Sequence, residues 1–185
     1  MMKKFFCLLF CLVTLTCQAQ RVNMKKYMKG AVPVVEGVVT FSHDYTVAGA
    51  SEERLFTLLQ AFAGSLVEAS DFEDYAKVTM QSRENRRVVA NLRDKIVFSQ
   101  RKWKTDTTTV SYRLLMFYEE GRVHAQLQDF VYSYEGDVLR AERWITDEYA
   151  LKDGGKALRK GSGKFRKATI DFAEQLFARL EEALK

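Results

Sequence analysis

The sequence predicts an α+β domain: an antiparallel sheet of about five strands with two amphipathic helices packed on one face, in the order strand, helix, four strands, helix. Two segments, residues 51–69 and 164–184, repeat their apolar residues at helical spacing. The segments before and between them alternate apolar and polar residues, which is typical of strands with one buried face. Short turns join consecutive strands, so the sheet is antiparallel, and the helices must cover its apolar face.

The first predicted strand spans residues 39–47 and points every second side chain toward the core. Those inward residues are Val39, Phe41, His43, Tyr45 and Val47. His43 therefore falls on the apolar face, and we expect it to be a structural histidine of the core or its rim, hydrogen-bonded to a neighbour. The functional alternative is a polar group in a ligand pocket.

The first helix is predicted to begin at Ser51 and to end near Ala69. Ser51 is a favourable N-cap, and Glu52 and Glu53 place negative charge at the positive end of the helix dipole. The apolar stripe that follows consists of Leu55, Leu58, Leu59, Phe62, Leu66 and Val67. This stripe is the face that we expect to lie on the sheet.

Strand patterns dominate the middle of the chain. Residues 78–80 and 88–92 alternate on either side of a short turn, and residues 96–98 continue the second strand past a break at Arg93–Asp94. The polar stretch 100–106 is predicted to be a loop.

A second hairpin is predicted further along. A strand over residues 110–116 meets the turn at 119–121 and returns over 123–134. The turn at 135–137 then leads into a further element over 138–144. These elements complete the sheet.

The chain ends in a glycine-rich basic loop and a long helix. The loop covers residues 152–163, and the helix is predicted from Lys164 to Leu184. Its apolar face consists of Phe165, Ile170, Phe172, Ala173, Leu176, Phe177, Leu180 and Leu184. A face this broad predicts extensive burial against the sheet.

The N-terminus has the pattern of a secretory signal peptide. Lys3 and Lys4 precede an apolar run over residues 5–15, which is too short to span a bilayer. We expect residues 1–19 to be removed, leaving Gln20 as an unlipidated N-terminus of an exported protein, periplasmic or secreted. The alternative is a lipoprotein anchored through Cys17, although Thr16 and Thr14 fit a lipobox poorly.

The remaining chain divides into an N-terminal arm, residues 20–33, and a single α+β domain, residues 34–185. The arm is polar and basic and reads as a tether or a weakly ordered segment. Cleavage after Ala19 would leave 166 residues with a formal charge of +3, too weakly basic for a nucleic-acid-binding protein. All three cysteines lie in the first 17 residues, so the exported domain is predicted to be disulfide-free, and no second apolar run reaches transmembrane length.

No arrangement of residues predicts catalysis, a metal or a cofactor. A zinc site would need His43, His124 and an acid such as Asp129, without helical spacing between them. The stretch Gly161-Ser162-Gly163 lacks the pattern of a nucleophile elbow, and residues 160–164 do not match a phosphate loop. We therefore predict a protein that is not an enzyme and that holds neither metal nor cofactor.

The loop before the last helix is the candidate binding site. Six cations fall between residues 156 and 167 without an acid, and cations at a helix N-terminus oppose the helix dipole. A helix N-terminus also attracts anions. The candidate anion-binding residues are Lys160, Ser162, Gly163, Lys164, Arg166 and Lys167. The alternative is a solvated basic loop.

Four motifs give a resemblance to a known family. They are VPVVEGVVTF at residues 32–41, SEERLF at 51–56, WITDEYAL at 144–151 and GKFRKATID at 163–171. The chain resembles an exported family of unknown function from Bacteroides-type bacteria with a TBP-like fold. The resemblance implies a curved sheet gripping helices on one face, a helix-grip-like arrangement, and it implies no reaction. "TBP-like" names a topology and carries no DNA-binding inference.

Together these observations predict an exported, non-catalytic binding domain of the cell envelope. Its ligand would be an apolar or anionic envelope component, such as a phosphorylated glycolipid or an acidic glycan. The alternative is a structural or protein–protein interaction module with a filled interior, and a hydrolase is a distant third. A small molecule or a protein that copurifies from the native envelope would distinguish the first two.

Overall fold

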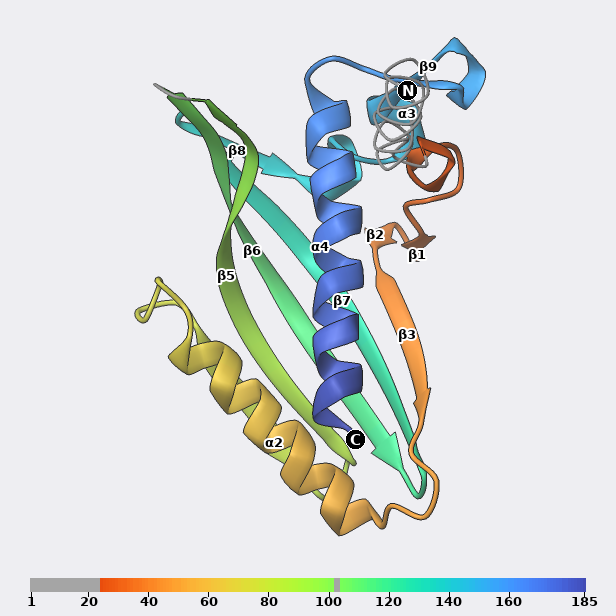
Figure 1. Cartoon of the computed structure of the whole chain (residues 1–185), viewed down its shortest axis with the longest axis vertical. Helices are drawn as coiled ribbons and strands as arrows, with labels where there is room; N and C mark the ends of the chain where they lie inside the picture. The colour runs from red at the N-terminus through yellow and green to blue at the C-terminus, as the bar shows by residue number, and fades with distance from the viewer. Residues whose placement is uncertain (1–23, 102–103) are drawn as a thin grey trace, which may run out of the picture.

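The computed structural model describes residues 24–101 and 104–185 and shows the predicted α+β fold (Figure 1). One antiparallel sheet runs in the order β3-β7-β6-β5-β4, and β8 also pairs with β7. The sheet therefore has six strands, slightly more than the five predicted. Its strands are β3 (Phe41–Thr46), β4 (Lys77–Ser82), β5 (Arg87–Arg101), β6 (Lys104–Glu119), β7 (Arg122–Tyr134) and β8 (Asp137–Arg140).

Strands β3 and β8 share one edge of the long strand β7. The register pairs β3 with residues 122–127 of β7 and β8 with residues 131–134. The predicted turn at 119–121 is confirmed, because Glu119 pairs with Arg122 across a tight turn in which Gly121 has a φ of 71°. That left-handed conformation favours glycine.

The hairpin between β5 and β6 is longer than predicted. Strand β5 runs without a break through Arg93–Asp94, and the predicted loop at 100–106 is wrong because pairing continues to Arg101 and Lys104. Backbone hydrogen bonds extend the two strands whether or not their side chains are apolar, and the threonines of β6 suit a strand. This part of the hairpin lacks apolar alternation, which is why its pattern reads as a loop.

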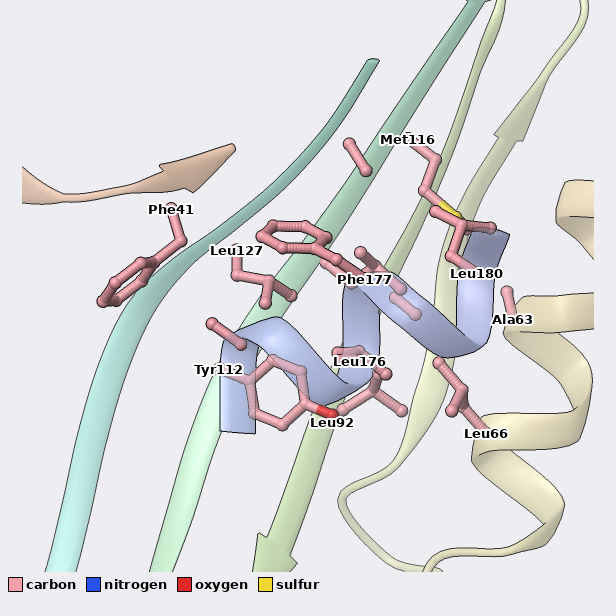
Figure 2. Packing of buried hydrophobic residues seen from close by; sticks show 14 of the residues in the cluster. Phe41, Ala63, Leu66, Leu92, Tyr112, Met116, Leu127, Leu176, Phe177 and Leu180 are labelled. Atoms are coloured by element: carbon pink, nitrogen blue, oxygen red, sulfur yellow. The ribbon is translucent and has the colours of Figure 1, made fainter. Parts of the chain in front are cut away.

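Two helices cover one face of the sheet, as predicted. Helix α2 spans Glu52–Glu68 with Ser51 as its N-cap, since the Ser51 hydroxyl accepts from the Arg54 N–H at 3.3 Å. Helix α4 spans Ser162–Ala183 and lies lengthwise across the sheet in front of β7 (Figure 1). Helices α2 and α4 lie side by side on the sheet, with Leu176 and Leu180 of α4 on the side where Ala63 and Leu66 of α2 lie (Figure 2).

The core follows the period-two pattern of the strands. Alternate residues of β5, β6 and β7 point to the helices and are almost fully buried: Val88, Ala90, Leu92, Val110, Tyr112, Leu114, Met116, Val123, Ala125 and Leu127. A bulge in β7 shifts the inward positions to Phe130 and Tyr132. Because one face is fully covered, a one-residue slip of any strand would expose its whole apolar set.

Short elements close the end of the fold where α4 begins. They are η2 (Met24–Tyr27), β1 (Val34–Val35), β2 (Val38–Val39), η3 (Ala141–Arg143), α3 (Asp147–Ala150), β9 (Leu151–Lys152), η4 (Asp153–Gly155) and β10 (Ala157–Leu158). The expectation of a weakly ordered arm is wrong for its described part. Tyr27 is buried, and its hydroxyl donates to Asp171 of α4 at 2.8 Å. Within residues 24–101 and 104–185, no helix has the length and apolarity needed to cross a membrane.

Buried phenols make the fold sensitive to alkali. Burial raises the pKa of Tyr45, Tyr112 and Tyr132 above the ordinary value of about 10. Above that pH the unfolded chain releases phenolic protons that the folded chain keeps, so the free energy of unfolding falls as pH rises. We expect these three phenols to ionise only together with loss of far-ultraviolet circular dichroism.

The measurement is tyrosinate absorbance and circular dichroism followed in one alkaline titration. Tyr45→Phe is the comparison variant, because it removes one of the three buried phenols and should reduce the tyrosinate absorbance that appears in the unfolding step. Ionisation of all the phenols near pH 10 while the dichroism stays native would contradict this prediction.

Candidate functional site

Arg166, one of the six predicted anion-binding residues, is used inside the protein. Its side chain is 0% exposed. The guanidinium donates to the carbonyl oxygens of Tyr27, Met28 and Ile145 at 2.6–2.7 Å. It also forms an ion pair of 2.7 Å with Asp147. Its hydrogen bonds tie the N-terminal segment and α3 to α4, and they leave the side chain no access to a ligand.

Ser162 and Gly163 also make internal contacts. The Ser162 hydroxyl donates to the carbonyl oxygen of Tyr149 at 2.7 Å, and the residue is buried. Gly163 lies so close to Leu158 that an added Cβ would be 2.7 Å from the Leu158 Cβ. Ser162 is therefore explained by its hydrogen bond to α3, and Gly163 by the packing of β10 against the first turn of α4.

Lys164 sits in a half-buried aromatic setting. Its ammonium donates to Asp106 and to the Tyr134 hydroxyl, both at 2.8 Å, and lies 4.6 Å from the centre of the Phe98 ring. Burial alone would lower the pKa of this amine, but its hydrogen bonds with Asp106 and Tyr134 outweigh burial and raise the pKa. The group therefore stays a cation at neutral pH.

Lys160 and Lys167 remain accessible. Lys160 is exposed, and Lys167 is half-buried with its ammonium 5.1 Å from the centre of the Tyr27 ring. The six predicted residues thus do not converge on one site: Arg166, Ser162 and Gly163 are structural. Only Lys164 and Lys167 reach a common hollow.

That hollow is a groove of about 380 Å³ between β5 and α4. Its lining from β5 includes Lys95, Ile96 and Phe98, and from α4 Lys164, Lys167, Ala168, Asp171 and Phe172. The hydrocarbon of Ile96, Phe98, Ala168 and Phe172 gives the groove an apolar part, while three lysines carry positive charge. Small-molecule sites combine these features, at volumes of roughly 300–1,000 Å³.

The single acid of the groove lining is already neutralised. Asp171 forms an ion pair of 2.6 Å with Lys26 and accepts from the Tyr27 hydroxyl. Hydrogen bonds with Asp171, and next with Glu174, raise the pKa of Lys26 above its ordinary value. Lys164 is likewise paired with Asp106, so the net positive charge that the groove presents to a ligand comes from Lys95 and Lys167.

Sequence reasoning missed Lys95, Ile96 and Phe98 as site residues. Ile96 and Phe98 were predicted only as the continuation of a strand past a break, Lys95 was not assigned, and nothing in their spacing shows which helix covers them. Val97 between them is 53% exposed, and its apolar character gives no sign in the sequence of a groove on the neighbouring residues.

The histidines do not form a metal site in the structure. His43 is exposed, which corrects the expected burial, and its ring contacts those of Tyr45 and Phe177 at 4.6 and 5.7 Å. His124 binds the Asp44 carboxylate at 2.6 Å, and Asp129 pairs instead with Arg113. Nowhere in the described parts of the chain do three His, Cys, Asp or Glu residues meet as a metal would require.

Two larger hollows, of about 520 and 530 Å³, lie beside β3. One is lined by Arg122, Glu119 and His124, and the other by Glu181 and Lys185. Both mix charges of opposite sign. Neither collects like charges around an apolar floor, so the groove beside β5 is the better candidate.

Comparison with known proteins agrees with this architecture. A family model described as a domain of unknown function (DUF4468) with TBP-like fold matches residues 41–133, from β3 to the end of β7. The chain belongs to this family. The family and the fold inferred by resemblance from the sequence are therefore confirmed.

Two solved structures are similar to this DUF4468 chain. A DUF4468 family protein from Bacteroides ovatus has 26% sequence identity and a TM-score of 0.84, covering 89% of this chain and 96% of its own. A TBP-like protein from Parabacteroides distasonis has 22% identity and a TM-score of 0.69, covering 83% and 96%, and shows the fold alone. No curated protein sequence shows significant similarity to the chain. The DUF4468 match ends before α4, so the groove joins a strand inside the matched segment to a helix outside it.

Proposed function

We propose that this DUF4468 protein is an exported, non-catalytic binding domain of the cell envelope. Its groove between β5 and α4 holds an amphipathic anion, a molecule with a hydrocarbon body and a carboxylate or phosphate head. The observation that supports this most is the convergence of Lys95, Lys164 and Lys167 around an apolar floor. An anionic envelope lipid has that chemistry.

Both the hydrocarbon body and the anionic head of such a ligand would contribute to its binding free energy. Hydrocarbon laid on Phe98 and Phe172 leaves water, which stabilises the complex by about 25 cal/mol for each Å² buried. An anionic head beside two or three ammonium groups makes charge-assisted hydrogen bonds, which are about twice as strong as neutral ones. A neutral amphiphile of the same length would gain only the first contribution.

The charge state of Lys164 supports binding over covalent chemistry. Its raised pKa keeps the amine protonated, so it lacks the free electron pair that a nucleophilic lysine needs. Because Asp106 already pairs with Lys164, most of the attraction for an anionic head comes from Lys95 and Lys167.

The test uses laurate as the anionic probe and dodecyl maltoside, below its micelle concentration, as the neutral probe. We expect calorimetry to show laurate binding that the double variant Lys95→Gln/Lys167→Gln weakens by roughly 10- to 100-fold, since two charge-assisted hydrogen bonds are lost. Ala168→Trp should abolish binding by filling the groove while keeping its lysines.

The control variant Lys77→Gln/Arg179→Gln removes the same charge at exposed positions outside the groove and should bind laurate like the wild type. Equal affinity for both probes would show that the lysines do not recognise the head. No laurate binding by the wild type would favour the alternative, a module that acts through protein contacts.

A further inference from the structure

Six basic side chains gather at the end of the molecule where α4 begins. They are Lys25, Lys29, Lys152, Lys156, Arg159 and Lys160, and all six are exposed. We refer to them as the basic cap. Figure 1 shows both contributing segments, η2 with its following turn and the β9–β10 hairpin, at this end.

The two segments of the basic cap are in contact and rigidly held. A Cβ placed on Gly155 would lie 3.0 Å from the Cβ of Lys29. Arg166 fixes the first segment by its hydrogen bonds to the carbonyl oxygens of Tyr27 and Met28. These contacts hold the two backbone segments that carry the cations next to each other.

Five of the six cations of the basic cap have no ion-pair partner in the part of the chain that the structure describes. Across residues 24–101 and 104–185, no carboxylate lies within ion-pair distance of Lys29, Lys152, Lys156, Arg159 or Lys160. Many other basic residues do meet a carboxylate: Lys26, Arg83, Arg86, Arg113, Arg122 and Lys185. The exposed acids Glu148 and Asp153 only partly offset the cap, so it presents a concentrated positive field.

The N-terminal part of the sequence joins the domain at this same surface. Met24 opens η2, only four residues after the predicted mature N-terminus Gln20 and seven after Cys17. Seven extended residues span at most about 25 Å. In the lipoprotein alternative, in which the chain is anchored through Cys17 and not cleaved after Ala19, the acyl chain would therefore hold the basic cap close to a bilayer.

We propose that the basic cap docks on the surface of an anionic phospholipid bilayer. Each lysine near such a surface strengthens binding roughly five-fold, and the attraction fades within about 10 Å, a distance that exposed side chains bridge. The inference goes beyond the groove ligand, because it assigns a different surface and a different partner. It also places the groove, at the first turns of α4, next to a membrane.

Vesicle cosedimentation of the full mature chain tests this. We expect binding to phosphatidylcholine vesicles that contain phosphatidylglycerol, no binding to pure phosphatidylcholine, and loss of binding as salt rises. The triple variant Lys152→Gln/Lys156→Gln/Lys160→Gln should bind roughly 100-fold more weakly. The control Arg54→Gln/Lys77→Gln/Arg179→Gln removes equal charge away from the cap and should stay near the wild type.

Equal losses in the two triple variants would overturn the proposal, since net charge and not the cap would then be responsible. Salt-sensitive binding to an acidic polysaccharide with none to vesicles would overturn it as well. Laurate binding separates the two proposals: the cap variant should keep it, and the groove variant Ala168→Trp should keep vesicle binding while losing laurate.

Discussion

Arg166→Ala is expected to lower the free energy of unfolding by about 3–5 kcal/mol, the usual cost of removing one partner of a buried ion pair. Truncation would leave the Asp147 carboxylate and the carbonyl oxygens of Tyr27 and Ile145 without their donor. It would also release the N-terminal segment from α4. For a domain of this size the melting temperature should fall by roughly 10 °C.

Urea unfolding of Arg166→Ala, Arg166→Lys and the wild type measures the effect. Arg166→Lys keeps the charge but lacks the planar fork that reaches four acceptors, so most of the loss should persist. Arg179→Ala, an exposed arginine on the same helix, is the matched control and should change stability by less than about 0.5 kcal/mol. If Arg166→Ala unfolded at the same urea concentration as the wild type, the hydrogen bonds of Arg166 would make no contribution to the free energy of unfolding.

Phe165→Ala should destabilise the protein by about 3–5 kcal/mol as well, through lost burial and a cavity. The ring is 1% exposed and lies at the centre of an aromatic cluster. Its neighbours are Phe98, Tyr132, Tyr134 and Trp144, with ring centres 4.6–5.8 Å away. Because Phe98 lines the groove, the same change should weaken laurate binding.

Denaturant midpoints of Phe165→Ala and Phe165→Leu distinguish burial from a specific aromatic role. Leucine refills much of the volume and should recover most of the stability. Val138→Ala is the control, since Val138 is 71% exposed and its truncation should be nearly neutral. If Phe165→Ala lost no more stability than Val138→Ala, the packing described for Phe165 would be wrong.

Local patterns alone predicted most of the fold. Ser51 caps α2, the alternation over 88–92 faces the helices, and the turn at 119–121 joins β6 to β7, all as the sequence indicates. Each of these features depends on neighbours within a few residues, through backbone periodicity, capping or turn geometry. Spacing along the chain contains that information.

The candidate site needed contacts between distant residues. In the sequence, Arg166 looks like one more cation of a basic loop. In the structure it is buried and donates to the carbonyl oxygens of Tyr27 and Met28, which lie 139 and 138 residues earlier in the chain. Lys95 and Lys167 meet in one groove only because α4 crosses the end of β5. His43 alternates with core residues but lies on the edge strand β3, where α4 leaves it exposed.

The sequence by itself therefore determined where the two long helices and most of the strands lie and which of their faces are apolar, although it missed the extension of β5 and β6 through residues 100–106. Tertiary structure alone decided which cations are buried, which are paired and which remain open to a partner. The physical reason is the separation along the chain of the residues that interact. Hydrophobic periodicity is a property of residues within one helix or strand. Ion pairs and grooves form between residues of different elements, which only tertiary packing brings together.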